Sequence, residues 1–155
     1  MNITDLYSIF NQHPQICTDS RKTIKNSIFF ALNGKNFNGN KYASAALKNG
    51  CAYAVIDDKN YSNHNNTILV TNVLEALQNL ATYHRKQLRI PIIGITGSNG
   101  KTTSKELINT VLNTQLKTFA TEGNLNNHIG VPLSILAINK QTEIGIIEMG
   151  ANHQH

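Results

Sequence analysis

Residues 90–103 read IPIIGITGSNGKTT, a short apolar run followed by a glycine-rich turn. The apolar run predicts a β-strand, and the residues from Lys101 onward predict a helix. In such a turn, glycines let successive backbone N–H groups point at phosphate oxygens. The lysine stabilises the β- and γ-phosphates, and the threonine hydroxyl can bind Mg²⁺. The stretch therefore predicts a binding site for a nucleoside triphosphate between a strand and a helix.

The turn departs from the general phosphate-loop pattern G-x-x-x-x-G-K-[ST], because Ile95 stands where that pattern has its first glycine. A shorter loop remains, in which Gly97 and Gly100 precede Lys101 and a pair of threonines. The similarity to kinases and GTPases is therefore partial. An ordinary turn that caps a helix is the alternative, and the flanking strand and helix argue against it.

The residues after this loop continue an α/β pattern. Residues 117–120 and 142–149 predict two further strands, whose unalternating apolar side chains suit a parallel sheet covered on both faces. One apolar stripe is predicted on a helix that begins near Lys101, at the spacing i, i+1, i+4, i+5. The stripe consists of Leu107, Ile108, Val111 and Leu112.

The residues that precede the strand before the glycine-rich loop predict a small α/β unit of their own. An apolar cluster around Leu6 indicates a first helix, and Gly50 closes a second helix over residues 41–49 in the left-handed conformation. Strands are expected at residues 15–18, 27–32, 51–57 and 67–71. The fold class that this order of helices and strands predicts is α/β.

A long helix ends this first unit. Asn72 and Glu75 form a capping box at its start, and its apolar residues line one face. Pro91 favours an extended residue before it, which marks the start of a new segment. We therefore expect two domains, residues 1–88 and residues 89–155.

Composition limits the classes of partner. The 155 residues carry a formal net charge of +5, but the basic residues are dispersed, so we expect nucleotide ligands and no nucleic acid. Cys17 and Cys51 lack metal-ligand spacing and are expected to be reduced core thiols of a cytoplasmic protein. No apolar run approaches the roughly 20 residues that span a bilayer, so no membrane association is expected.

Four segments together resemble the Mur ligases of peptidoglycan synthesis. Besides the phosphate loop, they are CTDSR at 17–21 with FFALNGKNFNGN at 29–40, TEGNLNNHIGVP at 121–132 and IEMGANH at 147–153. The resemblance covers the whole chain. It is strongest to the member of the family that adds D-alanyl-D-alanine to UDP-N-acetylmuramoyl-tripeptide.

The resemblance implies an ATP-dependent, Mg²⁺-dependent ligase. ATP would phosphorylate the terminal carboxylate of the UDP-muramoyl tripeptide, and the amine of D-alanyl-D-alanine would attack the acyl phosphate. Lys101 and Glu148 are the implied catalytic residues, and Thr102 and Glu148 are the implied Mg²⁺ ligands. The implied ATP phosphate-binding residues are Gly97, Ser98, Asn99, Gly100, Lys101, Thr102 and Thr103.

Glu148 has a plainer alternative, since a carboxylate after an apolar strand can be a solvated loop residue. Metal binding is favoured because ligands of open α/β sheets bind beyond the carboxyl ends of strands. His153 and His155 follow closely, and we expect neither to be a metal ligand.

Asparagines precede a predicted apolar helix that has Pro132 near its start and Leu133, Leu136 and Ala137 facing inward. They cap this helix in one interpretation; in the other, which the resemblance implies, they face substrate or phosphate. The two interpretations are compatible, and both stay open. The asparagines are Asn124, Asn126 and Asn127.

The resemblance assigns Ser20, Arg21 and Asn38 to the uridine-nucleotide substrate, and an arginine fork suits a pyrophosphate. A polar turn after a strand is the plain alternative. The family often has FDGH where this chain has FNGN at residues 37–40, which removes a potential charge at each of the two changed positions.

Ligases of this family are much longer than this chain. We therefore expect a fragment that cannot turn over by itself, and a complete enzyme that is monomeric. A parallel sheet of three strands would leave an unpaired edge and an uncovered apolar face, so residues 1–88 should be the better-folded part. The alternatives are a sister ligase, folylpolyglutamate synthase, a non-catalytic nucleotide-binding module and a P-loop kinase.

Overall fold

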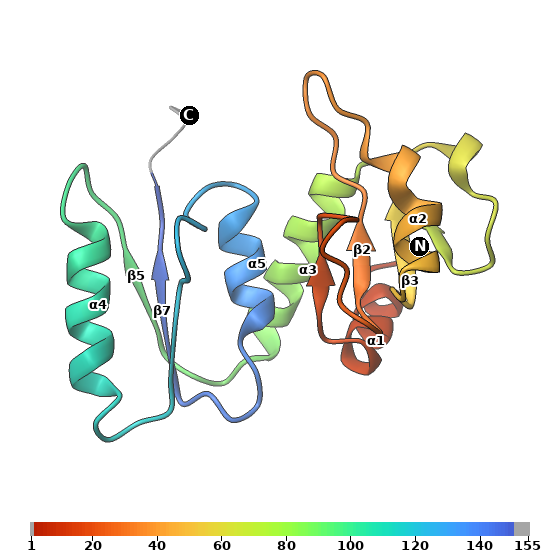
Figure 1. Cartoon of the computed structure of the whole chain (residues 1–155). Coiled ribbons are helices and arrows are strands. Elements are labelled where there is room, and N and C mark those ends of the chain that lie inside the picture. Colours follow the sequence, from red (N-terminus) through yellow and green to blue (C-terminus); the bar gives the residue numbers. More distant parts are fainter. Residues whose placement is uncertain (1, 151–155) are drawn as a thin grey trace. The chain divides into compact units, whose positions relative to one another are not determined.

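The computed structural model of the chain describes residues 2–150 (Figure 1). Its elements form two compact units, Met1–Tyr83 and His84–His155, called unit 1 and unit 2 below. This division falls inside a long helix, before the proline that we expected to mark the boundary. Each unit is an α/β structure on a parallel sheet, so the expected fold class is confirmed.

Unit 1 is built on a four-stranded parallel sheet with the strand order β1-β2-β3-β4. The expected strands and helices are all present, although the strands are shorter than predicted. The elements are α1 (Ile3–Gln12), β1 (Ile16–Cys17), β2 (Ile28–Phe30), the 3₁₀ helix η1 (Gly39–Tyr42), α2 (Ala43–Lys48), β3 (Tyr53–Ile56), the 3₁₀ helix η2 (Lys59–Tyr61), β4 (Thr67–Leu69) and α3 (Val73–Gln87), which continues into unit 2.

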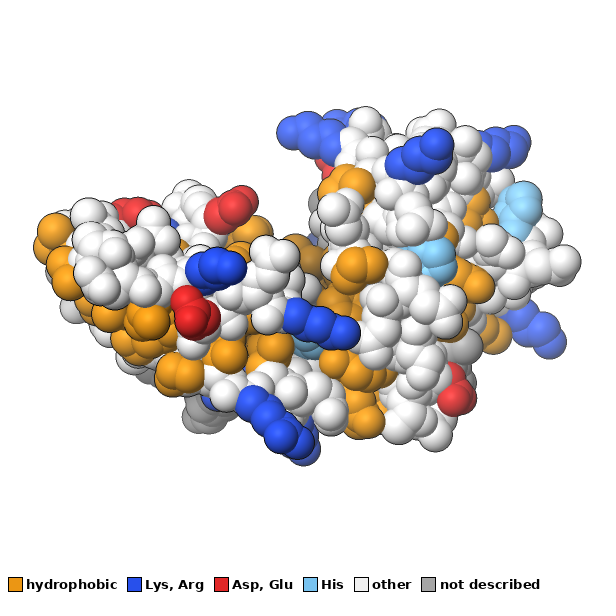
Figure 2. Space-filling view, turned by 90° about the horizontal axis from the view of Figure 1, so that it is seen from below, with side chains coloured by type: hydrophobic (Ala, Val, Ile, Leu, Met, Phe, Trp, Pro, Cys, Tyr) orange, Lys and Arg blue, Asp and Glu red, His pale blue; other side chains and the backbone are white. Residues whose placement is uncertain are grey.

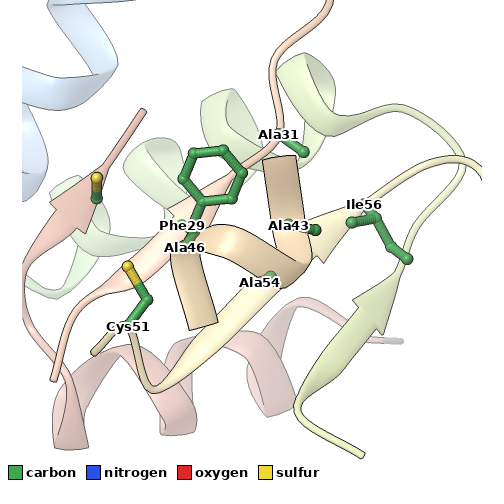
Figure 3. Close-up of a cluster of buried hydrophobic side chains, with 8 residues drawn as sticks. Phe29, Ala31, Ala43, Ala46, Cys51, Ala54 and Ile56 are labelled. Carbon is green, nitrogen blue, oxygen red and sulfur yellow. The ribbon is translucent and has the colours of Figure 1, made fainter. Parts of the chain in front are cut away.

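Buried side chains cover both faces of this sheet. Phe29 belongs to a cluster between the strands and α2, which Figure 3 shows. The cluster consists of Cys17, Phe29, Ala31, Ala43, Ala46, Cys51, Ala54 and Ile56. Ile28, Phe30 and Val55 alternate with these residues along the strands and are also fully buried. Both faces are therefore packed, as continuous apolar strands predict.

The two cysteines are buried and free, which confirms the expectation of core thiols. Cys17 Sγ donates to the Asp19 carbonyl at 3.2 Å, and Cys51 Sγ lies 3.3 Å from Ser27 Oγ. Burial raises the pKa of the Cys17 thiol. A protonated, buried thiol is a poor nucleophile, so Cys17 has a packing role.

Two predicted helix ends in unit 1 have the expected geometry. Gly50, just after α2, has φ +107°, a conformation that residues with side chains rarely adopt. Asn72 Oδ1 accepts the backbone N–H of Glu75 at 2.9 Å and caps α3. These local interactions explain why the sequence places the ends of both helices well.

Unit 2 is built on a three-stranded parallel sheet with the order β5-β7-β6. Its elements after α3 are β5 (Ile92–Ile95), α4 (Lys101–Leu112), β6 (Thr118–Ala120), α5 (Gly130–Ala137) and β7 (Ile144–Glu148). Figure 1 shows α4 and α5 on opposite sides of this sheet. The central strand is β7, and Ile95 is paired in register with Glu148. The carboxyl ends of β5 and β7 therefore lie next to each other.

The predicted helix with the apolar stripe is present as α4, but Leu107 and Val111 of the stripe are 64% and 67% exposed, and Ile108 and Leu112 are half-buried. One prediction about a helix face is wrong, because Ala137 of α5 is exposed, whereas Leu136 is buried as expected. Helical periodicity finds the face that carries apolar residues, but neighbouring elements decide which face is covered. On α4 the buried side chain is Lys105.

The described part of the chain has no helix that is both long and apolar enough to cross a membrane. On the face that Figure 2 shows, lysine and arginine side chains lie at separate places and form no single patch. This distribution agrees with the dispersed basic residues of the sequence.

Candidate nucleotide and metal site

The glycine-rich loop connects β5 to α4 and is exposed. Gly97 and Gly100 have φ values of +146° and +74°, and Gly100 is the residue that precedes the first turn of α4. These conformations favour glycine and allow the chain to turn sharply into the helix. The start of α4 carries free N–H groups and the positive end of the helix dipole, so it is suited to bind a phosphate group.

Lys101 is the first residue of α4, and its Nζ donates to the Gly97 carbonyl at 2.6 Å. The side chain therefore folds back over the loop. Its ammonium is held beside the loop whose N–H groups could bind a phosphate group. Ser98, Asn99, Thr102 and Thr103 surround it in the loop and first helical turn and are exposed.

Glu148 is the last residue of β7 and is only 2% exposed. Its Oε2 accepts the Thr102 hydroxyl at 3.0 Å, and its Oε1 accepts Asn126 Nδ2 at 2.9 Å. The interpretation of Glu148 as a solvated loop residue is therefore wrong. The structure brings together three of the predicted site residues, each from a different segment of unit 2.

The hydrogen bond from Asn126 is the main influence that lowers the pKa of Glu148. Burial acts in the opposite direction, and the Thr102 hydroxyl and the charges of Lys105 and Lys101 lower the pKa further. Glu148 is therefore an ionised carboxylate at neutral pH. A cation could therefore bind one oxygen of the Glu148 carboxylate and the oxygen of the neighbouring Thr102 hydroxyl.

Mg²⁺ fits the residues that are present. It is usually bound by one or two carboxylates together with waters and substrate phosphates, and not by a cage of protein ligands. Thr102 and Glu148 provide two oxygens within 3.0 Å of each other beside the phosphate loop. Among residues 2–150, no group of three or more His, Cys, Asp or Glu side chains could hold a metal ion. A cation held by Thr102 and Glu148 would therefore need further ligands to complete its coordination.

The three predicted asparagines have different positions. The Asn126 side chain donates to Glu148, and the Asn126 backbone carbonyl accepts the Gly150 N–H at 2.6 Å. Asn127 Oδ1 accepts the N–H groups of Ile129 and Gly130, so it caps α5 as the plain interpretation predicted. Asn124 is exposed.

The predicted substrate residues of unit 1 lie in two clusters. Arg21 is exposed and makes a bidentate contact with Asp19, at 2.9 Å from Nε and 2.8 Å from a terminal nitrogen, next to Ser20. Asn38 is part of an amide cluster in which its Oδ1 accepts both N–H groups of Asn40, from the backbone and from the side chain. Asn40 is buried and also donates to Asp57 at 2.8 Å.

Two buried residues near Glu148 received no role from the sequence. Lys105 donates from Nζ to the Thr121 carbonyl at 2.6 Å, and Thr121 Oγ1 accepts the Glu148 N–H at 3.0 Å. Both residues are about 1% exposed. The sequence offered one signal for Lys105, because a residue four positions after Lys101 lies on the same side of the helix. That signal is weak, since a lysine on a helix is usually solvated. His153 and His155 lie outside the described residues.

A glycine-rich loop between a parallel strand and a helix, with a carboxylate at the end of the neighbouring strand, is typical of nucleotide-binding α/β proteins. Family comparisons agree: the Mur ligase family catalytic domain matches residues 14–94, and the Mur ligase middle domain matches residues 95–155. The chain therefore belongs to the Mur ligase family, which confirms the resemblance seen in the sequence.

Similar proteins carry more specific names. The UDP-N-acetylmuramoyl-tripeptide--D-alanyl-D-alanine ligase of Bacillus subtilis is 44% identical over 87% of this chain and 30% of its own length. A MurF structure from Acinetobacter baumannii has 32% identity and a TM-score of 0.84, over 99% of this chain and 36% of that chain. MurF ligase from Thermotoga maritima in complex with ADP has 32% identity and a TM-score of 0.81, over 94% of this chain and 33% of that chain. The chain thus spans about a third of the length of these relatives.

Proposed function

We propose that this chain is part of an ATP-dependent ligase that joins D-alanyl-D-alanine to UDP-N-acetylmuramoyl-tripeptide through an acyl phosphate. The observation that carries the proposal is the buried Glu148 side chain beside the phosphate loop, held by Thr102 and Asn126. Relatives that bear this activity in their names support the choice of substrates.

In this proposal, unit 2 binds the phosphates of ATP. The loop N–H groups and the Lys101 ammonium neutralise charge on the phosphoryl group as it transfers to a carboxylate oxygen of the tripeptide and ADP leaves. Thr102 and Glu148 would hold Mg²⁺, which shields the negative charge of the β- and γ-phosphates when bound. The amine of D-alanyl-D-alanine then attacks the acyl carbon, and phosphate and a proton are released.

We also propose that residues 1–88 form the domain that binds the uridine nucleotide and residues 89–155 form the first part of the ATP-binding domain. Arg21 supports the first assignment, because its exposed guanidinium could exchange Asp19 for a pyrophosphate. Asn38 uses its oxygen within its own cluster, so only its Nδ2 would be available to substrate. The buried free cysteines favour a cytoplasmic protein.

The test is ATP-dependent phosphate release by the complete protein that contains this chain. UDP-muramoyl tripeptide and D-alanyl-D-alanine are supplied separately and together, and a Lys101→Ala variant is measured in parallel. We expect release only with both substrates, and a loss of at least about 100-fold in the variant, since Lys101 stabilises the transferred charge.

Other outcomes would replace the proposal. Release with a single amino acid in place of D-alanyl-D-alanine would indicate a sister ligase. Nucleotide binding without release would indicate a non-catalytic module, and stable transfer of phosphate to a hydroxyl acceptor would indicate a kinase.

A further inference from the structure

Lys105 is a charged residue in the interior of unit 2. It lies one helical turn after Lys101 on α4, and it is 1% exposed. Lysine is almost never fully buried unless its ammonium is paired. Here Nζ donates to the Thr121 carbonyl at 2.6 Å and lies 3.0 Å from Glu106 Oε1. The charge is therefore placed at the end of β6, away from solvent.

Thr121 connects Lys105 to the end of β7. Its backbone N–H donates to the Ile146 carbonyl at 2.9 Å, which continues the pairing of β6 with β7. Its Oγ1 accepts the backbone N–H of Glu148 at 3.0 Å. Thr121 thus accepts a hydrogen bond from Lys105 at its backbone carbonyl and a second one from the Glu148 backbone N–H at its hydroxyl.

The start of α4 is consequently attached to the end of β7 by two routes. Thr102 donates directly to the Glu148 carboxylate, whereas Lys105 acts through Thr121 on the Glu148 backbone. If Thr102 and Glu148 bind a cation, their oxygens turn to it and the direct hydrogen bond is lost. The route through Lys105 uses neither of these oxygens, so it is retained.

We propose that Lys105 is a positioning residue that keeps the Glu148 carboxylate at the correct distance from the phosphate loop while Thr102 and Glu148 bind the metal ion of a metal–nucleotide complex. The inference rests on the proposed nucleotide site. Lys105 itself does not touch the nucleotide, because its ammonium is buried against Thr121 and Glu106.

The test is ADP binding by the complete protein, measured by calorimetry with excess Mg²⁺ and again with EDTA. The variant Lys105→Met removes the charge and keeps an unbranched side chain in the buried position. We expect it to lose affinity for ADP by about tenfold or more with Mg²⁺, as is usual when a partner of a metal ligand is removed. Its affinity with EDTA should equal that of the wild type.

Glu106→Gln is the matched control, because it alters the exposed partner of Lys105 and leaves the bond to Thr121 in place. It should bind ADP like the wild type in both conditions. Thr121→Val tests the second link, since it keeps the carbonyl and removes the oxygen that accepts the Glu148 N–H. We expect the same loss of ADP affinity with Mg²⁺ and none with EDTA. If Lys105→Met does not fold, the result for Thr121→Val tests the inference instead.

The inference is overturned if Lys105→Met keeps the wild-type dependence on Mg²⁺, or if it loses affinity equally with Mg²⁺ and with EDTA. Equal loss would mean that Lys105 supports the fold and not the metal ligand. Wild-type protein that binds no ADP in either condition would overturn the proposed nucleotide site, and the inference with it.

Discussion

At the scale of single residues, the predictable part of the site is the part that has a local signal. Lys101 and Thr102 follow from the loop pattern, because each belongs to one short motif. Lys105 and Thr121 could not be found in the same way. Their proposed role depends on a contact between residues 16 positions apart and on burial that no local pattern reports. The sequence therefore indicates the candidate phosphate-binding residues better than it indicates the residues proposed to support them.

Asp19 gives a prediction about pH at the same scale. Hydrogen bonds from the Arg21 side chain and backbone lower the pKa of Asp19 to about 2. The folded pKa lies below the ordinary value, so the pairing stabilises the fold fully above about pH 4 and this contribution is lost as the pH falls towards 2. An NMR titration of the Asp19 carboxyl group should give a midpoint near 2.

Arg21→Ala provides the control for this titration, because it removes the guanidinium that makes the two side-chain contacts. The midpoint of Asp19 should then rise towards that of an ordinary aspartate. An unchanged midpoint would show that Arg21 does not hold this carboxylate in solution, and that its guanidinium is already available to a phosphate group.

At the scale of elements, strands were easier to predict than their arrangement. Residues 142–149 were expected to form a strand, and β7 is present at Ile144–Glu148. Its place between β5 and β6 could not be predicted, since strand order depends on how the connecting helices pack. That order puts Glu148 beside Ile95 and thus creates the site. The exposed residues of α4 have the same cause, because the spacing of Leu107 and Val111 does not tell which neighbour covers them.

Gly130 at the start of α5 is predicted to be essential for the Glu148 site. A Cβ atom there would lie 2.4 Å from the Leu125 carbonyl carbon, and backbone cannot move away as a flexible side chain can. Gly130→Ala should therefore displace the segment that carries Asn126. We expect a loss of about 1–3 kcal/mol in unfolding free energy, measured by denaturant titration, and weaker ADP binding in the presence of Mg²⁺.

Gly34→Ala is a suitable comparison, because the nearest atom to its Cβ would be at an ordinary contact distance of 3.9 Å. It should change the unfolding free energy by less than about 1 kcal/mol. If the two variants are equally stable, the close approach of Leu125 to Gly130 does not constrain this segment.

At the scale of the whole chain, the two units differ in how completely their apolar residues are covered. The sheet of unit 1 has fully buried residues on both faces. Both units expose some large apolar side chains, and Figure 2 shows hydrophobic atoms on the surface of the chain. The difference lies in the core, because most of the buried apolar side chains among the described residues belong to unit 1 and few belong to unit 2. The exposed ones are Ile24, Phe37, Tyr42 and Leu69 in unit 1 and Leu107, Val111, Leu116, Leu125 and Met149 in unit 2. Among the described residues, β5 and β6 each pair with β7 alone, so both are edge strands.

This difference predicts the order of proteolysis for the 155-residue chain. Local opening requires less free energy where fewer apolar contacts hold an element, so a protease should cut first beyond Pro91. After these cuts are trimmed back to the end of α3, mass spectrometry should find a resistant fragment that ends near residue 88. First cuts inside residues 1–88 would contradict the prediction. The complete protein is the control: if its remaining residues cover the exposed side of α4, cleavage beyond Pro91 should slow while cleavage within unit 1 stays the same.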